Sequence, residues 1–349
     1  MSDVVVFTAP REAAVRDEAL PPLEGGQVRV ETLYSGISAG TELTAYRGSN
    51  PYLHKRWDPD RRLFVEADGT SLEYPVEGWG YEEVGRIREV GPGVQGLAPG
   101  TLVWGAWGHR ASAAVPAERA GACVMPGGLD ARSGIFSRIG AIALNAVLDA
   151  DIHVGEVVAV FGQGVPGLIV GQLAALNGAT VVAVDAIPKR LELARALGAA
   201  HVIDARAGDA AAQIKALSEG RGADVSIEIT GSYRALHEAI RATAYSSRVV
   251  ASGFFQGDGA GLFLGEEFHH NRIEVVCSQI SGVSPRLDHR WDLRRLEQTI
   301  MRLAADGRVN LDALVSHVFA IDRAAEAFAL LDQRPEDAVQ VVLDFQHAA

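Results

Sequence analysis

An uncharged stretch of 28 residues, from Val157 to Val184, constrains the fold of this chain more than any other feature. Its length would suit a membrane-spanning helix. Glycines, a proline and amide side chains interrupt it, however, and a lipid-facing helix does not carry so many helix breakers at its centre. We interpret it as a buried strand at 157–161, a glycine turn, a helix at 166–177 and a second buried strand at 181–184. Continuous apolar runs are typical of parallel strands that are covered on both faces. The stretch therefore predicts a βαβ unit and no membrane anchor.

The hydrophobic pattern changes character near residue 145. Before it, short extended runs bounded by Gly-Pro and Pro-Gly turns predict a mostly β region, with strands at 28–33, 83–90, 102–104 and 113–115. After it, strands alternate with helices, as in a doubly wound parallel sheet. The strands expected there are 157–161, 181–184, 201–203, 225–229, 248–252 and 273–278. A helix at 293–305 and a strand at 340–345 fall outside this count, and we expect both to return to the first domain.

We therefore predict an α/β protein of two domains. A split, mostly β catalytic domain would comprise residues 1–142 and 282–349, and a doubly wound nucleotide-binding domain, 143–281, would be inserted into it. The length of 349 residues agrees with about two domains of roughly 100–200 residues each.

The amino-acid composition limits which binding partners and which cellular compartment we expect. The formal net charge is −12 and there is no basic block, which argues against nucleic acid or an anionic membrane as a partner. Two cysteines, Cys123 and Cys277, cannot build a disulfide framework or a four-cysteine zinc site. The N-terminus lacks the basic and long apolar regions of a signal peptide. We expect a cytoplasmic protein that acts on a small molecule.

Residues 162–167 read Gly-Gln-Gly-Val-Pro-Gly and match the dinucleotide-binding pattern G-x-G-x-x-G. The match follows a predicted strand and opens a predicted helix, which is the context that gives this pattern weight. Gly162 would permit the tight turn, Gly164 would let the backbone approach a pyrophosphate, and Gly167 would let helix and strand pack closely. Val165 and Pro166 open the helix whose N-terminal N–H groups would bind the phosphates. The alternative is a structural glycine turn without a ligand.

Asp185 ends the next strand and indicates which nucleotide is bound. Its carboxylate would accept hydrogen bonds from a ribose diol and repel a 2′-phosphate, which favours NAD over NADP. Arg190, on the following helix, would lie along the adenosine and weaken that preference. Open α/β sheets bind ligands beyond the carboxyl ends of their strands. Four further residues at such ends are expected near the nicotinamide: Thr230, Gly253, Phe254 and Ser278.

With these motifs in place, the sequence resembles the medium-chain dehydrogenase/reductase superfamily, whose familiar members are zinc alcohol and polyol dehydrogenases. The resemblance covers nearly the whole chain. It is carried by residues 35–43 (Ser-Gly-Ile-Ser-Ala-Gly-Thr-Glu-Leu), 80–85 (Gly-Tyr-Glu-Glu-Val-Gly), 138–147, and 160–167 with Asp185. It implies a split GroES-like β-domain around a Rossmann domain, a nicotinamide cofactor and, as in many members, a homodimer.

This sequence departs from the family pattern at the positions that usually carry the zinc ligands. Ser38 stands where the first cysteine ligand is expected, Tyr81 where the histidine ligand is expected, and Arg138 near the third ligand position. These side chains do not bind Zn²⁺ as Cys, His and Glu do. We therefore expect the scaffold and the nucleotide, but no metal ligands and no zinc. Bacteriochlorophyllide dehydrogenases are similar in these two boxes, and the resemblance implies oxidation of a secondary alcohol.

Without zinc, a positioned acid or base must handle the hydroxyl proton. Tyr81 lies in the right box, although a phenol titrates near 10 and would need help from a cation or a hydrogen bond. Ser38 and Thr41 can donate to a substrate oxygen or relay a proton, and Glu82 would orient Tyr81 or the arginine. His109, between two tryptophans and an arginine, is a second candidate base. The alternatives are simple packing for Tyr81, turn hydrogen bonds for the two hydroxyls, and a core or surface position for His109.

Two further polar segments remain. His269 and His270 follow two glutamates, but neighbours in an extended segment point to opposite faces and chelate one ion poorly, so we expect a loop there. Residues 49–74 show no period and are expected to form a long surface loop that covers a site. The basic and aromatic side chains of that loop suggest a polyhydroxylated or anionic substrate.

Together these features predict a zinc-independent, NAD-dependent oxidoreductase that interconverts a secondary alcohol and a ketone. Two alternatives stay open. One is a reductase of an activated C=C bond, against which Asp185 weighs because those enzymes generally prefer NADPH. The other is a nucleotide-binding sensor that has lost catalysis.

Overall fold

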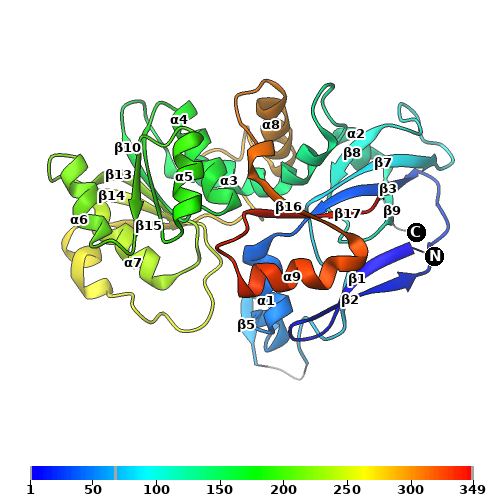
Figure 1. The fold of residues 1–349 in the computed structure, drawn as a ribbon, viewed down its shortest axis with the longest axis horizontal. Coiled ribbons are helices and arrows are strands. Elements are labelled where there is room, and N and C mark those ends of the chain that lie inside the picture. Colours follow the sequence, from blue (N-terminus) through cyan, green and yellow to red (C-terminus); the bar gives the residue numbers. More distant parts are fainter. Residues whose placement is uncertain (1, 67–68, 347–349) are drawn as a thin grey trace. The chain divides into compact units, whose positions relative to one another are not determined.

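The computed structural model describes residues 2–66 and 69–346 (Figure 1). The chain divides into two compact units, one formed by Met1–Arg138 with Asp312–Ala349 and the other by Ile139–Leu311. The first unit is mostly β and the second alternates strands with helices, so the predicted α/β class is confirmed. Within the described ranges, no helix is both long and apolar enough to cross a bilayer.

The second unit is a doubly wound Rossmann unit. Its six parallel strands lie in the order β12-β11-β10-β13-β14-β15. Helices α4 and α5 cover one face of this sheet, and α6 and α7 cover the other (Figure 1). The bounds are β10 Val157–Phe161, α4 Val165–Leu176, β11 Thr180–Asp185, α5 Pro188–Ala196, β12 His201–Asp204, α6 Ala210–Leu217, β13 Ala223–Glu228, α7 Tyr233–Ala242, β14 Thr243–Ala251 and β15 Glu274–Cys277.

The local sequence explains these elements. β10 and β11 are the two halves of the uncharged stretch, and their central valines and alanines are fully buried. Helix starts carry suitable caps: the Asp209 side chain accepts from the main chain of α6, and the Ser232 side chain does the same for α7. Pro188 opens α5, where its missing N–H is not needed.

The first unit is built on a six-stranded sheet that joins the two ends of the chain. Its order is β16-β17-β3-β7-β8, with β9 paired to β3, and the C-terminal strand β17 runs antiparallel to β3. A smaller sheet has the order β2-β1-β6. The bounds are β1 Ser2–Ala9, β2 Glu12–Glu18, β3 Gln27–Gly36, β6 Val76–Glu77, β7 Glu83–Val90, β8 Leu102–Gly105, β9 Ser112–Pro116, β16 Val315–Ala320 and β17 Gln340–Asp344.

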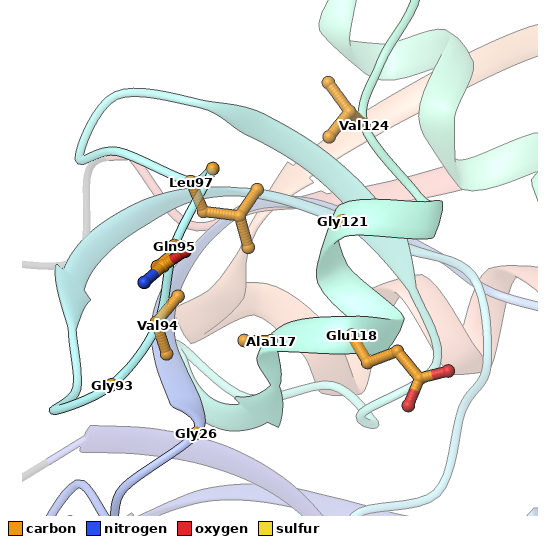
Figure 2. Close-up of a pocket in the computed structure, with 10 residues that line it drawn as sticks. Gly26, Gly93, Val94, Gln95, Leu97, Ala117, Glu118, Gly121 and Val124 are labelled. Atoms are coloured by element: carbon orange, nitrogen blue, oxygen red, sulfur yellow. The ribbon is translucent and has the colours of Figure 1, made fainter.

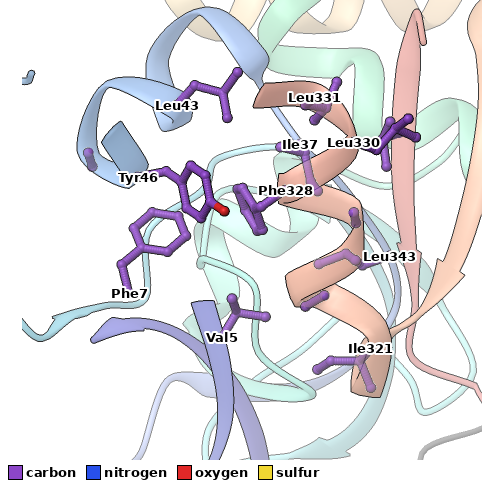
Figure 3. Packing of buried hydrophobic residues seen from close by; sticks show 14 of the residues in the cluster. Val5, Phe7, Ile37, Leu43, Tyr46, Ile321, Phe328, Leu330, Leu331 and Leu343 are labelled. Carbon is purple, nitrogen blue, oxygen red and sulfur yellow. The ribbon is translucent and has the colours of Figure 1, made fainter. Parts of the chain in front are cut away.

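Two helices, α1 Ala39–Arg47 and α9 Ala324–Gln333, close the apolar core of this unit. Figure 3 shows the rings of Phe7, Tyr46 and Phe328 together, with centroids between 4.9 and 5.7 Å apart. Edge-on and stacked aromatic pairs of this kind stabilise a core beyond the area they bury. The core thereby fixes the start of α1, which carries candidate site residues.

The segment 49–74, expected as a loop, has local structure in its described part. After the short 3₁₀ turn Pro51–Leu53, strands β4 Arg56–Asp58 and β5 Leu63–Val65 form a hairpin. The ring of Phe64 packs against Tyr52 and Trp57, which holds this hairpin together. Residues 67 and 68 of the segment lie outside the described residues.

The remaining helices are α2 Ala117–Ala122, α3 Phe136–Ala150 and α8 Leu293–Ala305. We assigned the last of these to the split domain, whereas the structure groups it with the second unit. The reason is packing: a Cβ atom on Gly140 of α3 would lie 2.5 Å from Ile300 of α8. The domain boundaries predicted at 142/143 and 281/282 stay predictions.

Candidate active site and nucleotide-binding turn

Three of the predicted catalytic residues share hydrogen bonds in the first unit. Ser38 immediately precedes α1, Thr41 lies in its first turn, and Tyr81 lies just before β7. The Tyr81 hydroxyl is hydrogen-bonded to Ser38 Oγ and lies 3.2 Å from Thr41 Oγ1. The Ser38 side chain makes no capping bond to α1, so its hydroxyl serves Tyr81 instead.

The Tyr81 side chain is half-buried, and its phenol stays protonated. Burial raises its pKa, and the nearby Glu82 carboxyl raises it further, while the hydroxyls of Ser38 and Thr41 only partly oppose this. The cation that would have lowered its pKa is not among these neighbours. In this environment Tyr81 is suited to donate a hydrogen bond or relay a proton, and it is a poor base by itself.

Glu82 is fully buried beside this hydroxyl group. Neither of its carboxylate oxygens has a hydrogen-bond partner among the described residues, so the expected orienting bond to Tyr81 is not formed. Burial raises the pKa of Glu82 well above its ordinary value, as do the charges of Glu42 and Glu83, whereas the Ser38 hydroxyl lowers it. A Cβ atom on Gly36 would lie 2.6 Å from Glu82 Oε2, so only a glycine leaves room for this carboxyl group.

His109 is buried as well, with 1% of its surface exposed. Its Nε2 lies 2.5 Å from Glu42 Oε2, and its Nδ1 lies 2.6 Å from Ser35 Oγ. Burial alone would lower the pKa of His109, but the charge and hydrogen bond of Glu42 and the charge of Glu83 raise it. Because both ring nitrogens are engaged by the protein, His109 holds its neighbours in place and does not face a substrate.

Sequence reasoning missed two members of this buried group, Ser35 and Glu83. Ser35 donates to Glu83 Oε1 over 3.2 Å, and Glu83 Oε2 accepts from the main-chain N–H of Trp107 at 2.7 Å. Burial raises the pKa of Glu83 to about 7, although His109 and these hydrogen bonds lower it. The available signal was the Glu82-Glu83 pair at the start of a strand, because two consecutive charged residues there cannot both point to solvent.

The side chains at the family's metal positions do not fit Zn²⁺. Ser38 and Tyr81 offer hydroxyl groups that are bonded to each other, and Arg138 offers a guanidinium. In the part of the chain that the structure describes, metal-ligating side chains converge at His237, Glu266 and Glu267, in the second unit. There the Arg241 guanidinium, 3.5 Å from Glu267 Oε1, already supplies a positive charge.

His269 and His270 follow this acidic pair. They lie in a helical segment, contrary to the expected loop, and their rings stand perpendicular with centroids 5.4 Å apart.

The glycine turn of the second unit has the shape that a dinucleotide requires. Gly162 has φ = +101°, a region that favours glycine, and a Cβ atom on Gly167 would lie 1.8 Å from the Gly162 carbonyl oxygen. Gly164 precedes α4, which begins at Val165 and Pro166, and a Cβ atom on Gly164 would meet nothing closer than 3.9 Å. The turn is thus tight at its base and open at the helix N-terminus, where phosphates bind.

Asp185 and Arg190 lie on either side of this turn. Asp185 Oδ2 accepts from the main-chain N–H of Gln163 at 2.6 Å, and Oδ1 accepts from that of Ile187 at 2.8 Å. Each oxygen keeps a further lone pair for a ribose hydroxyl. The Arg190 guanidinium lies 4.0 Å from the Cβ position of Gly164, beside the turn that would carry the phosphates.

The other predicted cofactor residues gather around a carboxylate that sequence reasoning missed. Glu228 ends β13, accepts from the main-chain N–H of Thr230 at 2.7 Å, and through its carbonyl oxygen accepts from Gly253 at 3.1 Å. Phe254 follows with its side chain exposed, whereas Ser278 is buried after β15 and bonds Ala251. An acidic residue at the end of an otherwise apolar strand was the signal for Glu228.

A surface hollow of about 470 Å³ in the first unit shares none of these residues. It lies between the loop around Val94 and Leu97 and helix α2, and Glu118 is the charged residue that lines it (Figure 2). With no convergent polar groups, it is no candidate for the catalytic site.

Comparisons with known proteins agree with this architecture. Residues 166–297 match the family model described as zinc-binding dehydrogenase. A D-guloside 3-dehydrogenase of Escherichia coli is 29% identical over 349 residues, covering 98% of this chain and 99% of the relative. An (R,R)-butanediol dehydrogenase of Bacillus subtilis is 26% identical, covering 88% and 89%. A solved structure from Sinorhizobium meliloti, bound to NADP, superposes with a TM-score of 0.79 at 22% identity and covers 99% of both chains.

Fold and site together define an oxidoreductase scaffold, in which a GroES-like β unit accompanies a Rossmann unit. These matches support the medium-chain dehydrogenase/reductase superfamily and an oxidoreductase of its alcohol dehydrogenase kind.

The raised pKa of Glu83 makes stability depend on pH. Between the ordinary value of 4.5 and about 7, the folded protein binds more protons than the unfolded chain, so its stability falls as the pH rises through this window. Glu83→Gln removes the ionisable group and therefore this pH dependence of stability. We expect the Tm of the variant, measured by calorimetry relative to that of the wild type, to rise between about pH 5 and about pH 8. Glu118→Gln, at an exposed position, is the control and should show no such trend. A Tm difference for Glu83→Gln that stays constant would show that Glu83 ionises normally.

Proposed function

We propose that this protein is a zinc-independent oxidoreductase that interconverts a secondary alcohol and a ketone with NAD. The observation that carries the proposal is the hydroxyl cluster in which Ser38 and Tyr81, at two of the family's metal positions, are joined by Thr41. The buried Glu82 lies next to Tyr81 in the sequence. These groups can donate to a substrate oxygen and move a proton, which are the tasks that zinc and its ligands otherwise perform.

The relatives support a polyhydroxylated substrate. Their names describe dehydrogenation of a guloside at position 3 and of butanediol, and both are oxidations of a hydroxyl group on a secondary carbon. The hairpin β4–β5 adds exposed cations, with Lys55, Arg56 and Arg62, next to the aromatic cluster of Tyr52, Trp57 and Phe64. Aromatic faces and cationic donors suit a sugar-like or anionic ligand.

The proton of the alcohol leaves through the hydroxyl cluster. Tyr81 receives it as its own proton passes to Ser38. The Ser38 proton would then pass to Glu82, whose pKa the Ser38 hydroxyl lowers but whose carboxylate it does not hydrogen-bond in the resting structure. Thr41 keeps the Tyr81 hydroxyl in place during this exchange. In the reverse direction the protonated Glu82 is the acid and Tyr81 donates to the ketone oxygen. A buried carboxyl with a raised pKa is suited to hold this proton, because burial stabilises its protonated form relative to that of an exposed carboxyl.

The glycine turn would hold the dinucleotide, with Gly162, Gly164 and Gly167 leaving room for the pyrophosphate and α4 supplying N–H groups. When bound, the nicotinamide accepts or supplies the hydride. Asp185 favours a free ribose diol, and therefore NAD, because a 2′-phosphate would meet its negative charge. Arg190 beside the turn would contribute to phosphate binding and make the preference smaller.

We also propose a homodimer and a reducing compartment. β15 ends the parallel sheet, with Val275 and Cys277 exposed along it, and an uncovered edge strand of this kind is a ready site for pairing with a second copy. Both cysteines are free, as expected for a cytoplasmic protein.

Metal analysis tests the zinc-free chemistry. Because the three positions carry hydroxyl and guanidinium groups, the purified active protein should hold no stoichiometric zinc, and incubation with a chelator should leave turnover unchanged. Elemental analysis and activity measured on the same sample provide the check. One zinc per chain, lost together with turnover, would overturn the mechanism.

Replacement of Tyr81 tests the proton path. Tyr81→Phe removes the hydroxyl that joins the substrate oxygen to Ser38, so turnover of secondary alcohols should fall roughly 10²-fold or more. NADH affinity, measured by fluorescence titration, should stay the same. Tyr74→Phe is the matched control, since it removes a hydroxyl that donates to the Ala45 carbonyl oxygen outside the cluster, and should retain turnover. Equal turnover in both variants would mean that Tyr81 only packs, and wild-type turnover of enones with NADPH alone would contradict the proposed reaction.

Replacement of Asp185 tests the cofactor choice. Asp185→Ser removes the negative charge while a hydroxyl can still accept from the Gln163 N–H, so NAD binding should weaken relative to NADP binding. The loss of a charge-assisted hydrogen bond corresponds to roughly 10-fold or more. Calorimetric titration with both nucleotides measures the ratio. An unchanged ratio would show that Asp185 braces the turn without touching the ribose.

A further inference from the structure

Four buried side chains of the first unit form one chain of hydrogen bonds. Glu42 Oε2 contacts His109 Nε2, His109 Nδ1 contacts Ser35 Oγ, and Ser35 Oγ contacts Glu83 Oε1, at 2.5, 2.6 and 3.2 Å. All four side chains are at most 1% exposed, so water does not replace any of these bonds. This series of hydrogen bonds involves no residue of the proposed proton path.

The number of available hydrogens decides how this series of hydrogen bonds must be protonated. Its three contacts need three hydrogens. With both carboxyl groups ionised, a neutral His109 supplies one and Ser35 supplies one, which leaves one buried contact without a hydrogen. An unsatisfied buried acceptor is costly, and an additional proton removes that cost. This proton can lie on Glu83, whose pKa of about 7 allows it, or on His109. On His109 it puts a cation between two carboxylates, with Nε2–H donating to Glu42, Nδ1–H donating to Ser35, and Ser35 donating to Glu83.

We propose that Ser35 and Glu83 are positioning residues that keep His109 as a doubly protonated imidazolium at neutral pH, and that this imidazolium holds the Ser38–Tyr81 pair in its working geometry. The two carboxylates and the imidazolium carry a combined charge of −1. Loss of the proton would raise the negative charge next to Glu82 and break one of the three contacts.

The imidazolium reaches the Ser38–Tyr81 pair from two directions. Glu42, bound by one oxygen to His109, accepts through Oε1 from the main-chain N–H of Ser38 at 2.8 Å. Gly80, the residue before Tyr81, lies against the ring, since a Cβ atom on Gly80 would lie 3.0 Å from His109 Cε1 and Nε2. Gly80 also has φ = +120°, so its backbone is confined to this place by both conformation and contact. The position of one ring therefore sets both hydroxyl-bearing residues.

The charged groups that face His109 are few. Glu42 comes from α1, and Glu83 comes from β7. α9 presents Phe328, whose ring centroid is 5.9 Å away, and β1 presents the main-chain N–H of Val5, which donates to the His109 carbonyl oxygen. The protonation of His109 is therefore governed by the two carboxylates that the proposal names.

Glu83→Gln gives a sharp test because Trp107 fixes how the new amide is oriented. The Trp107 N–H points at this side chain from 2.7 Å, so the amide oxygen must face it and the amide N–H₂ must face Ser35. The amide then donates to Ser35, Ser35 donates to Nδ1, and His109 is left neutral with every contact made. The variant keeps all the hydrogen bonds but not the cation.

The measurement is ¹⁵N NMR of the full chain labelled at histidine, with the His109 signals identified as those lost in His109→Gln. At neutral pH we expect both ring nitrogens of wild-type His109 to be protonated, and Nδ1 to be deprotonated in Glu83→Gln. Ser35→Ala should also lose the imidazolium. Glu118→Gln, a surface change of the same kind, should look like the wild type. A wild-type His109 with one protonated nitrogen at neutral pH, or an unchanged His109 in Glu83→Gln, would overturn the proposal.

Kinetics test the link to the active site, and this link rests on the proposed function. The pH profile of alcohol oxidation should lose one ionisation in Glu83→Gln, while KM for NAD stays the same. An unaltered profile would refute the coupling to Ser38 and Tyr81. Because the NMR experiment needs no substrate, failure of the imidazolium proposal can be distinguished from failure of the proposed function. Absence of turnover with the expected NMR result would refute the proposed function alone, and turnover with a singly protonated wild-type His109 would refute the imidazolium alone.

Discussion

The buried series of hydrogen bonds from Glu42 through His109 and Ser35 to Glu83 is the constraint on which the first unit depends. Three segments of the chain, the end of β3, the start of α1 and the start of β7, each place an acidic or hydroxyl side chain there. Charges in a protein interior persist only when they are paired and hydrogen-bonded. A single imidazole that serves both Glu42 and Glu83 meets this condition and ties the three segments together, because removal of any partner leaves a buried charge without compensation.

Under the proposed function, the same arrangement would hold hydroxyl groups in place where the family pattern has metal ligands. A metal ion fixes its ligands through short bonds, and a cluster of neutral hydroxyls has no comparable anchor. In this protein the backbone next to the hydroxyl groups is held instead. The main-chain N–H of Ser38 donates to Glu42, and Gly80 packs against the ring of His109. Tyr81 and Ser38 are then positioned with the precision that proton transfer needs.

Local patterns predicted the parts of the structure that depend on local sequence. The uncharged stretch, the glycine turn and Asp185 were recognisable because period, breakers and spacing are all local properties. The contacts of His109 were not recognisable, since its partners Glu42 and Ser35 lie 67 and 74 residues away and only the paired sheet brings them together. Helix 293–305 was assigned to the wrong neighbour for the same reason: its apolar face indicates burial but does not specify that Gly140 receives Ile300.

The position of β17 has a consequence for the order in which the protein is made. This strand pairs with β3 beside Gly36, and Ile37, next to Ser38, donates its main-chain N–H to Val341. During synthesis the second unit, Ile139–Leu311, is complete while β17 is still absent. The second unit is therefore synthesised in full before the sheet of the first unit can be completed. The hydrogen bond that fixes Ile37, next to Ser38, can form only after β17 has been synthesised.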